Sequence, residues 1–138
     1  MSCPVLNSLL AAAAFAAALL LPPAIAAAEL AAQTSDAAGV MVSARPLDLS
    51  PGAREWRFEL SLNTHTVPLS DDLARTARLV DDAGHEQGAV AWNGDGAGGH
   101  HRRGTVSFRP VQPRPQAVEL RIQRPGEAAP RTFRWKLQ

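Results

Sequence analysis

The feature that most limits the fold of this chain is a strict alternation of polar and apolar residues over positions 55–62. The apolar residues are Trp56, Phe58, Leu60 and Leu62, and the residues between them are charged or polar. Successive side chains of a β-strand point to opposite faces of a sheet, so this pattern predicts a strand with one face in a core. A helix would repeat its apolar positions every three to four residues, which this segment does not do.

Shorter segments with β-strand character recur along the rest of the chain, with proline and glycine residues between most of them. Such spacing favours an all-β protein, an immunoglobulin-like antiparallel β-sandwich of about seven strands. A short helical turn is expected near residues 70–75, capped by Ser70 or Asp71. The predicted strands are 40–44, 55–62, 77–80, 86–92, 104–109, 117–123 and 131–137. The predicted core comprises Trp56, Phe58, Leu60, Val106, Phe108, Leu120, Ile122, Phe133 and Trp135.

The N-terminal segment predicts export from the cytoplasm. Residues 9–21 are an uncharged run rich in leucine and alanine, and Pro22 and Pro23 follow it. A membrane-spanning helix needs roughly 20 apolar residues, so this run is too short to be one. Ala26 and Ala28 fit the small-residue rule of signal peptidase. We therefore expect a signal peptide at 1–28, a flexible tail at 29–38 and a β-sandwich domain at 39–138, in a periplasmic or secreted protein without a membrane span after processing.

Composition narrows the expected class of partner. The only cysteine, Cys3, lies within the predicted signal peptide, so the mature chain has no thiol for a disulfide or a lipid anchor. The net charge is +1, and we interpret the basic residues of the second half as solvated surface. These observations predict a monomer that does not bind nucleic acid.

Histidines beside a glycine-rich loop are the one feature that suggests chemistry. Residues 93–99 contain four glycines, and His100 and His101 follow them. His65 ends the strongest predicted strand and would meet this pair if the two chain segments share one end of the sandwich. Imidazole nitrogens suit Cu(II) or Zn(II), and Asp72 or Asp95 would add an oxygen ligand.

Two interpretations of this region stay open at the level of sequence. In the first, His65, His100 and His101 form a metal site, with Trp92 and Arg102 on the rim of the binding surface. In the second, the His-His-Arg-Arg segment is a solvated turn and His65 holds the loop in place. Metal sites usually show tighter spacing than this one, so the pattern alone does not decide.

The chain contains none of the usual sequence motifs of catalysis. Gly-x-Ser-x-Gly, His-Glu-x-x-His and a phosphate-binding loop are all absent. We therefore expect a non-enzymatic binding or accessory module that binds Cu(II), Zn(II) or an envelope protein. The alternative is a structural or protein-interaction domain of the cell envelope that binds no metal.

Several motifs together resemble an uncharacterised family of small exported bacterial and archaeal β-sandwich proteins. The motifs are Thr-His-Thr-Val at 64–67, Trp-Asn-Gly at 92–94 and Gly-Gly-His-His-Arg at 98–102. The resemblance extends over most of residues 40–137. It implies a β-sandwich and an exported location, and it implies no activity and no functional residue.

Overall fold

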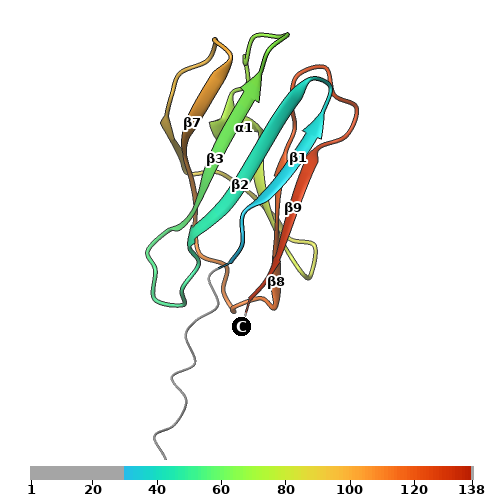
Figure 1. Cartoon of the computed structure of the whole chain (residues 1–138). Coiled ribbons are helices and arrows are strands. Elements are labelled where there is room, and N and C mark those ends of the chain that lie inside the picture. Colours follow the sequence, from blue (N-terminus) through green and yellow to red (C-terminus); the bar gives the residue numbers. More distant parts are fainter. Residues whose placement is uncertain (1–29, 138) are drawn as a thin grey trace, which may run out of the picture.

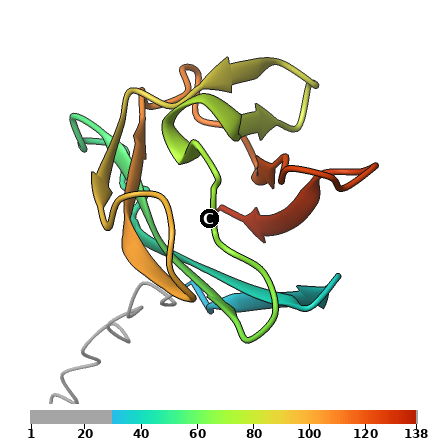
Figure 2. The ribbon, with the colours of Figure 1, turned by 90° about the horizontal axis from the view of Figure 1, so that it is seen from above.

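Two antiparallel β-sheets pack face to face in the computed structural model, which describes residues 30–137 (Figures 1 and 2). One sheet has five strands in the order β1-β2-β3-β7-β6, and the other has four in the order β5-β4-β8-β9. The elements are β1 (Gln33–Ala37), β2 (Val40–Asp48), β3 (Trp56–Thr64), α1 (Leu73–Thr76), β4 (Ala77–Asp81), β5 (Glu86–Gly88), β6 (Ala91–Gly94), β7 (His101–Phe108), β8 (Ala117–Ile122) and β9 (Arg131–Lys136). The predicted all-β sandwich is confirmed.

The strand order is that of an immunoglobulin-like sandwich. Strands β2, β3, β7 and β6 occupy the places of A, B, E and D in one sheet. Strands β4, β8 and β9 occupy those of C, F and G in the other, and β5 lies beside β4 as a C′ strand does. Strand β1 is an addition at the edge of the first sheet. The connections β3–β4, β6–β7 and β8–β9 therefore meet at one end of the sandwich, the upper end in Figure 1.

The described residues form nine strands where the sequence predicted about seven. One additional strand arises because the segment 86–92 divides between the two sheets. Strand β5 pairs with β4, whereas β6 pairs with β7. The chain crosses between the sheets at Ala89 and Val90, and Val90 N donates to Ser107 O at 2.7 Å. An alternating pattern predicts a strand but does not show to which sheet the strand belongs. The crossing between the sheets was therefore not predicted from the sequence.

The other additional strand corrects the prediction of a flexible tail at 29–38. Within that segment β1 pairs with β2 over five residues, from Gln33 to Ala37. The connecting residues Ala38 and Gly39 have φ values of 49° and 72°, as a two-residue hairpin turn with positive φ at both positions requires. Alanine is uncommon in that conformation, so a hairpin turn was not predicted from these residues.

The core lies between the sheets and contains all nine residues predicted for it. Each of them is at most 4% exposed. Phe58 is central to an aromatic cluster, with ring centroids 5.8 Å from Phe108 and 5.4 Å from Trp135. The predicted strand phase is therefore confirmed.

The predicted signal peptide at 1–28 lies outside the described residues. Between residues 30 and 137, no helix has the length and apolar character needed to cross a membrane.

Candidate functional site

The three connections at the upper end of the sandwich form the candidate site, and we call this surface the loop end. It consists of residues 65–72, 95–101 and 123–130. Backbone hydrogen bonds join the first two connections: Thr64 N donates to His100 O at 2.9 Å, Leu69 N to Gly99 O at 3.1 Å and Gly98 N to Leu69 O at 2.7 Å. The Leu69 side chain is fully buried beneath them. The glycine-rich loop is thus hydrogen-bonded along the β3–β4 connection.

Two glycines allow the loop to take this path. Gly98 and Gly99 have φ values of 108° and 70°, a region that residues with a Cβ atom rarely adopt. The resulting turn brings both Gly98 N and Gly99 O to Leu69. Part of the glycine content read from the sequence is therefore needed for backbone geometry.

The predicted histidines lie at the same end of the first sheet. His101 is paired with Asn63 across β7 and β3, and His65 comes two residues after Asn63. The side chains of His65, His100 and His101 are all exposed. Asn63 Oδ1 lies 2.8 Å from His101 Nδ1. An amide oxygen only accepts hydrogen bonds, so this contact places a proton on Nδ1.

The histidine side chains do not form a ready-made ligand group. Within residues 30–137, no three or more His, Cys, Asp or Glu side chains are grouped so that they could hold a metal ion. Binding of Cu(II) or Zn(II) stays a prediction.

The two carboxylates predicted as additional ligands already have partners. Asp72 caps α1, and its Oδ1 accepts a hydrogen bond from Arg75 N at 3.3 Å. The expected short helix is present, with Asp72 rather than Ser70 or Asp71 as its cap. Asp95 Oδ2 accepts from Arg103 N at 2.8 Å, which fixes the start of the glycine-rich loop against β7.

Arg102 was predicted on the binding rim, and the structure corrects that placement. Its side chain is buried, with the residue only 3% exposed. Nη1 donates to Asp71 O at 2.6 Å, Nη2 donates to Asp95 O at 3.2 Å, and the guanidinium lies 5.7 Å from the Trp92 ring centroid. Strand β7 extends from His101 to Phe108, and alternation along it places Arg102 on the same inward face as Val106 and Phe108. It joins two connections at the loop end from within.

Trp92 is half-buried beside Arg102. Its indole Nε1 donates to Asp95 O at 3.0 Å. The ring therefore packs against the loop and the Arg102 guanidinium.

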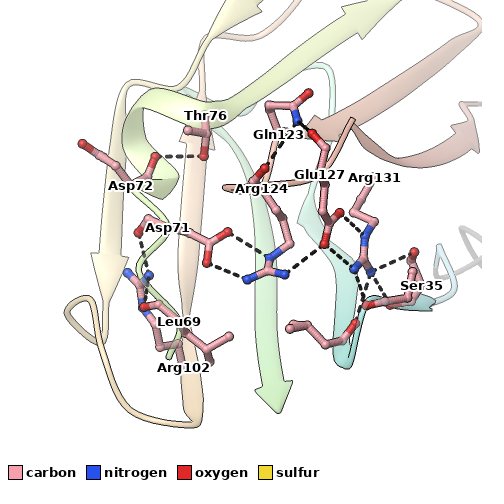
Figure 3. A network of polar contacts seen from close by, with 12 residues as sticks. Ser35, Leu69, Asp71, Asp72, Thr76, Arg102, Gln123, Arg124, Glu127 and Arg131 are labelled. Atoms are coloured by element: carbon pink, nitrogen blue, oxygen red, sulfur yellow. Dashed lines mark hydrogen bonds and ion pairs between the residues drawn. The ribbon is translucent and has the colours of Figure 1, made fainter. Parts of the chain in front are cut away.

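A chain of ion pairs links the β3–β4 connection to the second sheet (Figure 3). Arg124 pairs with Asp71 through Nε to Oδ1 at 3.0 Å and Nη2 to Oδ2 at 3.1 Å. Its Nη1 donates to Glu127 Oε1 at 3.0 Å. Arg131 donates to both oxygens of Glu127, each at 2.7 Å. The β8–β9 connection is thereby joined to the β3–β4 connection.

Arg131 also fastens the β1–β2 hairpin to this chain of ion pairs. Its Nη2 donates to Ala37 O at 2.7 Å, and its Nη1 donates to Ser35 O at 2.9 Å and to Val40 O at 3.2 Å. These carbonyls flank the turn at Ala38 and Gly39. One guanidinium therefore holds the added strand β1 against the second sheet.

Charge pairing shifts two pKa values in this network away from their ordinary values. Hydrogen bonds from Arg131 lower the pKa of Glu127, with a further contribution from Arg124, and together they outweigh the opposing effect of burial. Burial alone would lower the pKa of Arg124, but its hydrogen bonds to Asp71 and Glu127 raise it. Both pKa shifts favour the charged form of the side chain.

Comparison with models of known protein families, with curated protein sequences and with solved structures finds no match for this chain. The family resemblance read from the motifs stays a prediction.

Proposed function

We propose that this chain is an exported, non-enzymatic binding module that contacts its ligand through the loop end. The observation that carries the proposal is a set of buried side-chain contacts between the three connections of the loop end. Arg102 bonds to the β3–β4 and β6–β7 connections, and Arg124 of the β8–β9 connection pairs with Asp71 of the β3–β4 connection. A binding surface whose loops are already ordered loses less conformational entropy when a ligand binds. In immunoglobulin variable domains, loops at the corresponding end form the binding site, which is support by analogy of fold.

Cu(II) or Zn(II) is the ligand class that the exposed side chains at this end favour. Neutral imidazole is a good ligand for both ions. The hydrogen bond between His101 Nδ1 and Asn63 Oδ1 leaves Nε2 of His101 as the nitrogen with a free lone pair. Metal-binding histidines usually have their other ring nitrogen held in this way. His65 and His100 supply the further nitrogen ligands in this proposal.

Calorimetric titration of the untagged exported protein with CuCl2 and with ZnCl2 tests this function. The double variant His100→Ala/His101→Ala should weaken binding by at least about tenfold, a loss of about 1.4 kcal/mol. His85→Ala is the matched control, because His85 is exposed in the β4–β5 hairpin and bonded to Asp81 at 3.0 Å. That control should bind as the wild type does. Equal binding by the wild type and the double variant would contradict the proposal.

The rival function is a structural or protein-interaction domain of the cell envelope that adds a partner strand at a sheet edge. The edges formed by β1 and β9 are not open for such pairing, because Gln33 Nε2 donates to Arg134 O at 2.6 Å and Gln33 Oε1 accepts from Arg134 N at 3.2 Å. Trp135 Nε1 also donates to Ala31 O at 2.7 Å. This side of the sandwich is bridged, which favours the loop end over these edges as the binding surface.

A further inference from the structure

The outer face of the five-stranded sheet contains a pocket that is separate from the loop end. Its volume is about 360 Å³, and it is lined by Ala32, Ser43, Ala44, Arg45, Glu59, Ser61 and Arg103. The volume lies within the range of small-molecule sites, toward its lower limit. None of the described residues that line the pocket is aromatic, so they would recognise a ligand by charge and hydrogen bonds and not by stacking.

Strand register explains why the face is hollowed at this place. Ser43 is paired with Ser61, and Ser61 is paired with Arg103, across three neighbouring strands. In the adjacent row Arg45 is paired with Glu59. Two short hydroxyl side chains therefore lie between longer charged ones, and they form the floor of the pocket.

The charged walls of the pocket are formed by two arginines and one glutamate. Glu59 Oε1 lies 3.2 Å from Arg45 Nη2 and 3.4 Å from Arg103 Nη2, so two guanidinium groups share one carboxylate oxygen. The Arg103 side chain is 71% exposed. Its contact with Glu59 uses one of the five N–H donors of a guanidinium, and the planar group can offer two parallel donors to an anion.

We infer that this pocket binds the oxyanion of a small polar ligand, a carboxylate, sulfate or phosphate group. Arg103 supplies the principal donors, and Ser61 supplies a hydroxyl from the floor. Glu59 positions both guanidinium groups and opposes the ligand by its own charge. The inference does not depend on the function proposed for the loop end.

Titration of the 15N-labelled protein with sodium acetate, sodium sulfate and sodium phosphate, each at constant ionic strength and pH 7, tests the inference by NMR. At least one of the three anions should cause saturable shifts in the amide signals of Ser61 and Arg103. Acetate and the two tetrahedral anions are compared because they distinguish a carboxylate ligand from a sulfate or phosphate ligand.

Three variants should change the affinity for the anion in different ways. Arg103→Gln should weaken binding by about tenfold, the loss expected for a charged hydrogen bond. Glu59→Gln should tighten binding, because it removes the competing negative charge. Arg54→Gln, an equivalent change in the exposed β2–β3 connection, should leave the affinity unchanged.

Thermal unfolding of each variant establishes that it is folded before its affinity is compared. Shifts that stay linear with all three anions would overturn the inference. Equal affinity in the wild type and Arg103→Gln would also overturn it, as would an Arg54→Gln effect as large as that of Arg103→Gln.

Discussion

Asp71 and Arg124 lie 53 residues apart in the chain and form a bidentate ion pair with both side chains almost completely buried. Asp71 follows β3 of the first sheet, whereas Arg124 follows β8 of the second. The backbone carbonyl of Asp71 also accepts a hydrogen bond from Arg102. This residue therefore lies at the point where the three connections of the loop end are joined.

Replacing Asp71 with alanine should lower the free energy of unfolding by about 3 kcal/mol, because the change leaves Arg124 buried with only one of its two carboxylate partners. Urea titration at pH 7 measures the loss. Asp72→Ala is the neighbouring control, and it should cost about 1 kcal/mol as the loss of a helix cap. The double variant Asp71→Ala/Arg124→Met should be more stable than Asp71→Ala alone. A single-variant loss no greater than that of the control would contradict this account of the ion pair.

Acid should destabilise the protein partly through Glu127. Its pKa is lowered in the folded state from a value of 4.5, chiefly by hydrogen bonds from Arg131. The stabilisation that follows is present above the unfolded-state pKa and is lost as the pH falls through the lower folded-state pKa. Urea titrations between pH 7 and pH 3 should therefore show a smaller loss of stability for Glu127→Gln than for the wild type. Identical pH dependence of the two proteins would exclude a contribution from Glu127.

Removal of the Arg102 guanidinium should loosen the glycine-rich loop without unfolding the sandwich. In Arg102→Met the carbonyl of Asp71 loses the donor from Arg102, and the carbonyl of Asp95 keeps only the hydrogen bond from Trp92 Nε1. Amide hydrogen exchange of Leu69 and Gly98 should then become faster, since these two amides join the loop to the β3–β4 connection. Arg103→Met is the matched control on the exposed face of the same strand. Unchanged exchange at both amides in Arg102→Met would contradict the role assigned to this side chain.

Replacing Phe58 tests directly whether the inward face of β3 is assigned correctly. Phe58 is fully buried and contacts two other aromatic rings, so Phe58→Ala should cost about 3 to 5 kcal/mol. Urea titration of the variant against the wild type measures this difference. A cost below about 1 kcal/mol would be incompatible with a large side chain at the centre of a packed core.

The features that could be predicted from the sequence are those specified by local alternation. The run from Trp56 to Leu62 placed β3 and its inward face, and the later strands followed from the same rule. The course of the loop end was predictable in part, because the strand that leads to His65 and the loop that leads to His100 do finish side by side. Alternation records which face of a strand is apolar, and this is what a sandwich core requires.

The remaining features depend on contacts between distant residues. Strand β1 is held by Arg131 and by a turn in which Ala38 adopts a positive φ, and neither has a local sequence signal. The position of Arg102 depended on how far β7 extends, because the strand was predicted to begin at residue 104. It begins at His101, and alternation then places Arg102 on the same inward face as Val106 and Phe108. The pairing of Asp71 with Arg124 depends on two connections that come together only in the folded sandwich.

The central claim, that the loop end is the binding surface, is tested most directly by the position of bound Cu(II) in the 15N-labelled protein. Paramagnetic Cu(II) broadens the NMR signals of nuclei close to it. At one equivalent of the ion, the account predicts selective loss of the amide signals of 64–66 and 99–102, while those of 81–86 at the β4–β5 hairpin stay sharp. Selective loss at the hairpin that contains His85, or no selective loss anywhere, would contradict it.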